Sequence, residues 1–110
     1  GRQASVQREG NSGKAARSRE EVELMFDRNK SALYALYNRA LRDNPALQGK
    51  LVVQLTIAPS GEVKEAQVLS SELGDAELER RIIARIKGFR FEARDVETLV
   101  ARKTIEFFPA

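Results

Sequence analysis

The chain has 110 residues, of which 42% are hydrophobic and 32% charged, a length and composition typical of one globular domain. It contains no cysteine and no histidine, which excludes a disulfide scaffold, a thiolate metal site and the commonest general base near neutral pH. Residues 1–19 carry a net charge of +4, so the total of +3 leaves −1 for residues 20–110. The basic surplus lies outside the part expected to fold, which disfavours a nucleic-acid-binding face.

Residues 1–17 are predicted to be a flexible linker or arm ahead of the domain. They include three glycines, scattered charge and one large apolar residue, Val6, which is too little apolar surface to form a core. Such a segment is either a solvated tail with no role of its own or a basic arm that contributes to binding. The domain itself is predicted to span residues 18–110.

A long helix is predicted to begin at Ser18. The run Ser18-Arg19-Glu20-Glu21 is a capping box, in which the serine side chain accepts from the backbone of Glu21 and Glu21 reaches back. Apolar residues then recur at three- and four-residue steps along one face: Val22, Met25, Phe26, Leu33, Leu36, Tyr37, Ala40 and Leu41. Asn29 fills the gap in this stripe and is expected at its edge. Asn44-Pro45 ends the helix, because proline disfavours helical geometry in the residue before it.

Two strands are predicted after Gly49, where the period of the apolar residues changes to two. Residues 51–57 alternate as a strand with one buried face, and residues 63–70 return with a weaker alternation. Between them, Ala58-Pro59-Ser60-Gly61 places proline and glycine as a tight turn requires. The two segments therefore predict an antiparallel hairpin.

A second helix and a last strand complete the predicted domain. Asp75 is the expected N-cap of the helix, which presents Leu78, Ile82, Ile83 and Ile86 on one face and ends at Lys87-Gly88. Phe89 and Phe91 follow as core anchors in a loop, and residues 98–107 form the last strand. We predict an α+β fold in the order αββαβ, with two helices packed on one face of a three-stranded antiparallel sheet.

The sequence offers no constellation of residues suited to catalysis. Ser60, Ser70 and Ser71 have no histidine to activate them. Glu77 and Glu79 lie two residues apart on a helix and so face different directions. We predict that the protein is not an enzyme and that it has no catalytic residue, no cofactor and no metal site.

The predicted sheet suggests a binding site instead. Helices cover a face of a sheet and leave its edges open, where unpaired backbone groups can take up a strand from another chain. We predict that a partner binds along the last strand, at Thr98, Leu99, Val100, Ala101, Arg102, Lys103, Thr104, Ile105, Glu106 and Phe107. The pair Arg102-Lys103 allows two interpretations: its charge protects the edge from aggregation, or it frames a docking groove.

Several runs, taken in their order and spacing, give the chain a resemblance to a known family. The runs are Leu36-Tyr37-Asn38-Arg39-Ala40-Leu41, Asn44-Pro45-Ala46-Leu47-Gln48-Gly49-Lys50 and Leu55-Thr56-Ile57-Ala58-Pro59-Ser60-Gly61-Glu62-Val63. With Ser70-Ser71-Glu72-Leu73 and the closing Ile105-Glu106-Phe107, they make residues 19–109 similar to the TonB C-terminal domain family, and more narrowly to its AgmX/PglI C-terminal branch. The chain departs from the family at Phe91-Glu92, where Phe-Pro is common, and in its lack of cysteine.

The resemblance implies a role as a TonB-like energy transducer of the bacterial cell envelope. It implies a periplasmic domain, tethered to the inner membrane by an upstream segment and driven by a proton-powered motor in that membrane. The partner would be an outer-membrane receptor, whose short segment adds beside the last strand through backbone hydrogen bonds. Members of the branch also occur in gliding or adhesion machinery, so another envelope protein is an alternative partner.

Two further interpretations stay open from the residues alone. The domain could be a structural module of an envelope machine, in which the sheet edges of two copies pair to form a homodimer. It could also bind peptidoglycan or nucleic acid through the basic residues 1–17.

Overall fold

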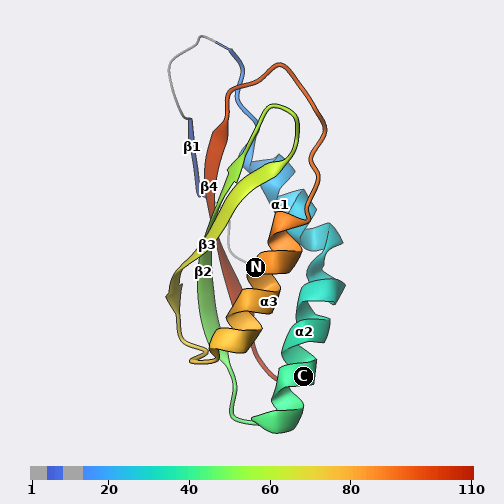
Figure 1. Ribbon diagram of the computed structural model, residues 1–110, viewed down its shortest axis with the longest axis vertical. Helices are drawn as coiled ribbons and strands as arrows, with labels where there is room; N and C mark the ends of the chain where they lie inside the picture. Colours follow the sequence, from blue (N-terminus) through green and yellow to red (C-terminus); the bar gives the residue numbers. More distant parts are fainter. Residues whose placement is uncertain (1–4, 9–13) are drawn as a thin grey trace.

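The computed structural model describes residues 5–8 and 14–110 of the chain. Its elements are β1 (Ser5–Arg8), α1 (Arg19–Arg28), α2 (Lys30–Asp43), β2 (Gly49–Ile57), β3 (Val63–Ser71), α3 (Ala76–Lys87) and β4 (Leu99–Phe107). The strands form one antiparallel sheet in the order β1-β4-β2-β3, and the three helices lie on one of its faces (Figure 1). The predicted α+β fold is confirmed, with β2, β3 and β4 as the three predicted strands.

The core fills the space between the helices and the inner face of the sheet. Alternate residues of β2 and β4 are buried on this face, and the residues between them are half-buried or exposed. The helices contribute Val22, Phe26, Leu33, Tyr37, Leu78, Ile82 and Ile86. Phe89 and Phe91 are buried in the loop after α3, as predicted. No helix formed by residues 5–8 and 14–110 lies over the outer face of the sheet (Figure 1), an arrangement common in antiparallel sheets.

The predicted first helix is divided into α1 and α2 at Asn29. The side-chain amide of Asn29 donates to the carbonyl oxygen of Met25 (2.9 Å), and the backbone N–H of Asn29 also donates to that oxygen (3.2 Å). This competition for one carbonyl loosens the helical ladder, as asparagine side chains commonly do. The helices of the described residues have 10, 14 and 12 residues, and none of them is long and apolar enough to cross a membrane.

Both predicted N-caps form, but the capping box is incomplete. The side chain of Ser18 accepts from the N–H of Glu21 (3.1 Å), and that of Asp75 accepts from the N–H of Leu78 (3.0 Å). The carboxylate of Glu21 does not reach back toward Ser18. It accepts instead from the guanidinium groups of Arg17 and Arg94, so its role is to hold segments that are distant in sequence.

The predicted turn between β2 and β3 is present, and it contacts the loop before β4. Gly61 donates its N–H to the carbonyl of Ala58 (2.9 Å) and has φ 92°, a conformation that favours glycine. A Cβ atom at Gly61 would lie 1.9 Å from the carbonyl oxygen of Phe91. Glycine is therefore required here both for the turn and for the close approach of the loop.

Within residues 1–17, for which a flexible linker is predicted, the structure differs from that prediction in two places. Residues Ser5–Arg8 form β1 and pair with β4, and Arg17 is buried, with 2% of its surface exposed. Composition missed both because β1 is stabilised by backbone pairing with a distant strand and Arg17 by contacts with distant carbonyls. Residues 1–4 and 9–13, which the linker prediction also covers, lie outside the described part of the chain.

A candidate docking edge along β4

β4 lies between β2 and β1 in the sheet. It pairs with β2 over all nine of its residues, from Leu99 opposite Ile57 to Phe107 opposite Gly49, without a bulge. On its other side, β1 lies opposite residues 99–102. We call this other side of β4 the docking edge. The chain itself therefore adds an extended segment to the docking edge.

The backbone groups of β4 alternate between β2 and the docking edge. Glu72 donates its N–H to the carbonyl of Lys50 (2.9 Å) on the β3 side of β2, so the even-numbered residues of β2 face β3 and the odd-numbered ones face β4. The register joins odd residues of β2 to odd residues of β4. The hydroxyl of Tyr34 donates to the carbonyl of Glu106, which agrees with this alternation. The residues whose backbone groups point to the docking edge are Val100, Arg102, Thr104 and Glu106.

The side chains of the predicted site residues divide between the two faces of the sheet. The buried ones, beneath the helices, are Leu99, Ala101, Lys103, Ile105 and Phe107. The half-buried or exposed ones, on the outer face, are Val100, Arg102, Thr104 and Glu106. Thr98 precedes the first residue of β4 and is half-buried. The predicted residues are thus the whole of β4 together with the residue before it, and the side of β4 that faces away from β2 presents mainly backbone groups.

The opposite edge of the sheet, β3, is irregular. Its register with β2 shifts twice, between Val52 and Val53 and between Thr56 and Ile57. These shifts leave Leu69 and Lys64 as extra residues on β3. A bulge twists a strand and interrupts the ladder that an added strand would need. Of the two outer strands of the predicted three-stranded sheet, β4 is therefore the more regular template.

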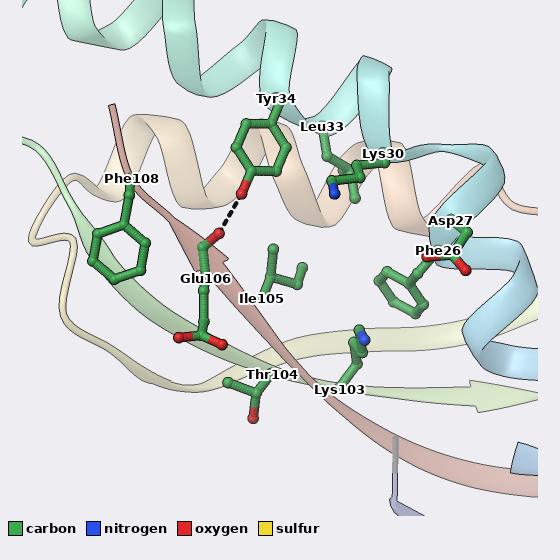
Figure 2. Close-up of a pocket in the computed structure, with 10 residues that line it drawn as sticks. All are labelled: Phe26, Asp27, Lys30, Leu33, Tyr34, Lys103, Thr104, Ile105, Glu106 and Phe108. Carbon is green, nitrogen blue, oxygen red and sulfur yellow. Dashed lines mark hydrogen bonds between the residues drawn. The ribbon is translucent and has the colours of Figure 1, made fainter. Parts of the chain in front are cut away.

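A pocket of about 300 Å³ lies between the second half of β4 and the helices α1 and α2 (Figure 2). Its apolar lining consists of Phe26, Leu33, Tyr34, Ile105 and Phe108. The ring of Phe108 stands at one end of the pocket and is 48% exposed. This volume is at the lower end of the range for ligand pockets, about 300–1,000 Å³. The pocket therefore suits an apolar side chain of a segment bound along β4.

The charged pair Arg102-Lys103 is divided between the two faces. The Nζ atom of Lys103 lies 2.7 Å from a carboxylate oxygen of Glu23 and 6.0 Å from the ring centre of Phe26, on the helix side. Arg102 is exposed on the outer face and donates to the side chain of Gln54 (3.0 Å). Lys103 is thus part of the pocket wall, whereas Arg102, the other member of the pair, is exposed to solvent.

Arg17 anchors the segment that precedes α1, a role that the sequence analysis missed. One guanidinium nitrogen of Arg17 donates to the carboxylate of Glu21 (2.7 Å) and to the carbonyl of Glu92 (2.8 Å). Another donates to the carbonyls of Ala58 (3.0 Å) and Pro59 (3.1 Å). The only sequence signal for this cluster is the four-residue spacing of Arg17 and Glu21. The carbonyls belong to turns that the fold alone brings together.

The anchor fixes where the N-terminal segment meets the domain. Burial lowers the pKa of Arg17 from its ordinary value, and the charge of Glu92 partly offsets this effect. Arginine ordinarily titrates so far above neutral pH that Arg17 stays charged. Next to it, Glu97 donates its N–H to the carbonyl of Ala15 (2.9 Å). The segment therefore lies along the loop that leads into β4, close to the residues that β1 pairs with.

Comparison of the chain with protein-family models, with curated proteins and with solved structures finds no match. The resemblance to the TonB C-terminal domain family has no support from these comparisons and stays a prediction. Among the described residues, no group of three or more acidic side chains is placed to hold a metal ion. The geometry of the docking edge is thus the basis on which a function can be proposed.

Proposed function

We propose that this chain is a protein-binding domain that takes up an extended segment of a partner by strand addition at the docking edge of β4. The observation that carries the proposal is the pairing of β1 with residues 99–102. A strand of four residues from a separate part of the chain already uses the backbone groups on this side. Such pairing supplies affinity through main-chain hydrogen bonds, which depend little on the sequence of the added strand.

The pocket supports the same edge as the site of recognition. In strand addition, side chains of the added strand enter pockets beside the sheet, and these pockets supply specificity. The pocket between β4, α1 and α2 lies next to Thr104, Ile105 and Glu106, beyond the residues opposite β1. A partner segment with an apolar side chain in this region would gain contacts in addition to the backbone ladder.

The biological setting of this proposal comes from the resemblance. In that setting the domain lies in the periplasm, and the partner is the N-terminal segment of an outer-membrane receptor or another envelope protein. A segment outside this sequence would tether the domain to the inner membrane, where a proton-driven motor acts on it. The domain would then transmit force to the receptor through the strand added to β4.

Self-association is the second candidate, and the pairing of β1 with β4 also favours it. The β1 segment of one copy could pair with β4 of another copy, because the exchange of an identical element between protomers creates few new contacts. The domain would then be a scaffold module of an envelope or motility machine. Sedimentation over a range of concentrations tests this: a strict monomer at high concentration would exclude it.

A proline substitution at Thr104 tests the leading proposal. The N–H of Thr104 points to the docking edge, so Thr104→Pro removes a donor for an added strand and leaves the ladder with β2 intact. In an NMR titration of the isotope-labelled chain with N-terminal peptides of outer-membrane receptors, we expect amide chemical-shift changes along residues 98–107. We expect the same peptides to bind Thr104→Pro at least about tenfold more weakly.

The matched control is Thr104→Ala, which removes the side chain and keeps the N–H. It should bind the same peptides with an affinity close to that of the unmodified chain. Equal binding by a folded Thr104→Pro variant would contradict strand addition at this edge.

A further inference from the structure

The strand β1 occupies part of the edge to which we assign the partner. We propose that β1 is an internal competitor for the docking edge, and that a partner segment binds by replacing it. This inference rests on the proposed function and concerns its regulation. The fraction of molecules in which β1 is paired with β4 then determines how readily the domain binds a partner strand.

The first support is that β1 uses the backbone groups that an added strand would need. Ser5 lies opposite Arg102 and Gln7 lies opposite Val100, and both β4 residues point their N–H and C=O groups to the docking edge. These two pairs are therefore the positions at which ladder hydrogen bonds join β1 to β4. A second strand cannot pair with residues 99–102 while β1 remains in place.

The second support is that β1 itself is held by few hydrogen bonds, whereas the residues that follow it are attached to the domain at Ala15 and Arg17. β1 has four residues, whereas β2 pairs with β4 over nine, so few hydrogen bonds hold β1. The same segment is tied to the domain at Ala15 and Arg17. A short tether keeps a weak binder at an effective concentration of about millimolar, so β1 can leave the edge and return without leaving the molecule.

The third support is the position of the pocket. The pocket is lined by residues of α1, α2 and the second half of β4, and β1 lies opposite the first half. A partner segment that runs along the whole of β4 gains the pocket in addition to the pairing it takes from β1. The competition therefore favours a segment longer than β1 that carries an apolar side chain at the pocket.

The chain's own sequence supplies a probe for the test, so that no natural partner is needed. We would use a labelled synthetic peptide with the sequence of residues 1–13 and measure its binding to full-length variants. Gln7→Pro removes a donor that faces β4, so it opens the edge. Val6→Pro is the matched control, because the N–H of Val6 points away from β4.

A disulfide provides the opposite perturbation. Ser5 and Arg102 lie opposite each other, and Cα atoms of such a pair are about 5.5 Å apart, within the range of about 4.4–6.8 Å for disulfides. Because the chain has no cysteine of its own, Ser5→Cys with Arg102→Cys gives a single bridge that holds β1 on β4. Reduction of the same molecule releases β1, so each sample is its own control.

We expect the apparent Kd of the peptide to be at least about tenfold lower for Gln7→Pro than for the unmodified chain, because the apparent affinity scales with the open fraction. Val6→Pro should match the unmodified chain. The oxidised double-cysteine variant should not bind, and reduction should restore binding. If the peptide binds Gln7→Pro and the unmodified chain equally well but does not bind the oxidised variant, β1 is not an effective competitor, and the proposed function is unaffected. If the peptide binds the oxidised variant as well, it binds outside residues 99–102, which contradicts both the inference and strand addition at this part of β4. If it binds none of them, strand addition at β4 fails and the inference fails with it.

Discussion

The two outer strands of the predicted three-stranded sheet, β3 and β4, are equal in length but differ in regularity. Each has nine residues. β3 contains two register shifts against β2, whereas β4 contains none. A regular edge can accept another strand, and a bulged edge resists it. The difference makes β4 the more favourable of the two strands for pairing with an added strand, and β1 already lies opposite part of it.

An exposed apolar side chain lies near each of these strands, and its surroundings differ. Leu69 is 42% exposed and is the extra residue of a bulge in β3, and Phe108 is 48% exposed at the end of a pocket beside β4. Exposure alone would make the two residues equivalent. Under the proposed function, the pocket and the regular ladder beside Phe108 favour a binding role for Phe108 and none for Leu69.

The largest expected effect is on stability, and it comes from substituting Arg17, which anchors the N-terminal segment to the domain. Arg17→Ala leaves three backbone carbonyls without a buried charged donor, and hydrogen bonds to charged groups contribute about 1.5–3 kcal/mol each. We expect the free energy of unfolding to fall by about 3 kcal/mol, measured by urea denaturation. Hydrogen exchange should quicken in β1 and at residues 99–102 more than in β3.

Arg94→Ala is the control for this prediction. Arg94 also binds Glu21, but its side chain is 42% exposed, so its loss should cost about 1 kcal/mol or less. Equal destabilisation by the two variants would show that the buried contacts of Arg17 contribute no more than an exposed ion pair, which would contradict the role of Arg17 as an anchor.

Proline substitutions compare the two strands directly. The N–H of Ala66 in β3 points away from β2, as the N–H of Thr104 in β4 does. We expect Thr104→Pro to weaken receptor-peptide binding by about tenfold or more, which corresponds to about 1.4 kcal/mol of binding free energy. We expect Ala66→Pro to change the affinity by less than about twofold, because the peptide is expected to bind along β4 and not along β3. Calorimetric titration of both variants checks this. Similar losses in both would remove the distinction between the strands.

Deletion of Leu69 should remove one of the two register shifts between β3 and β2. The residues on either side keep their partners in β2, so the shift between Val52 and Val53 disappears while the buried face is unchanged. We expect the deletion variant to self-associate through the repaired edge, seen as a sedimentation mass that rises with concentration. Leu69→Ala keeps the bulge and should sediment as the unmodified chain does. No difference between the two variants would mean that this bulge does not protect β3.

The smallest expected effect is at the pocket. Phe108→Ala should weaken peptide binding by about fivefold, or about 1 kcal/mol, and change stability by about 0.5 kcal/mol or less because the ring is half exposed. Leu69→Ala should leave binding unchanged. A loss of binding with Leu69→Ala and none with Phe108→Ala would place the docking surface on β3.

The sequence predicted the elements that depend on local pattern and missed the contacts between distant segments. The apolar alternation in β2, the turn at Gly61 and the cap at Asp75 follow from neighbouring residues, and the structure contains all three. The division of the first helix was missed because Asn29 fits an apolar stripe as an edge residue. Its hydrogen bond to Met25 is what interrupts the helix.

The candidate site was predicted only in outline. The sequence predicts the last strand as an open edge of the sheet. In the structure β4 pairs with β2 on one side, and β1 lies opposite residues 99–102 on the other side. The pocket depends on where α1 and α2 cross β4, which periodicity does not determine. The pairing of β1 was missed because residues 1–17 have the composition of a linker, and four backbone pairs leave almost no trace in composition.

The most direct test of strand addition at β4 is to identify which backbone atoms a bound receptor peptide contacts, by intermolecular NOEs in the labelled full chain. The account predicts contacts between the peptide backbone and Val100, Arg102, Thr104 and Glu106, with loss of the contacts between β1 and residues 99–102. Contacts with Ala66 and Val68 on β3, or with the helices alone, would contradict it.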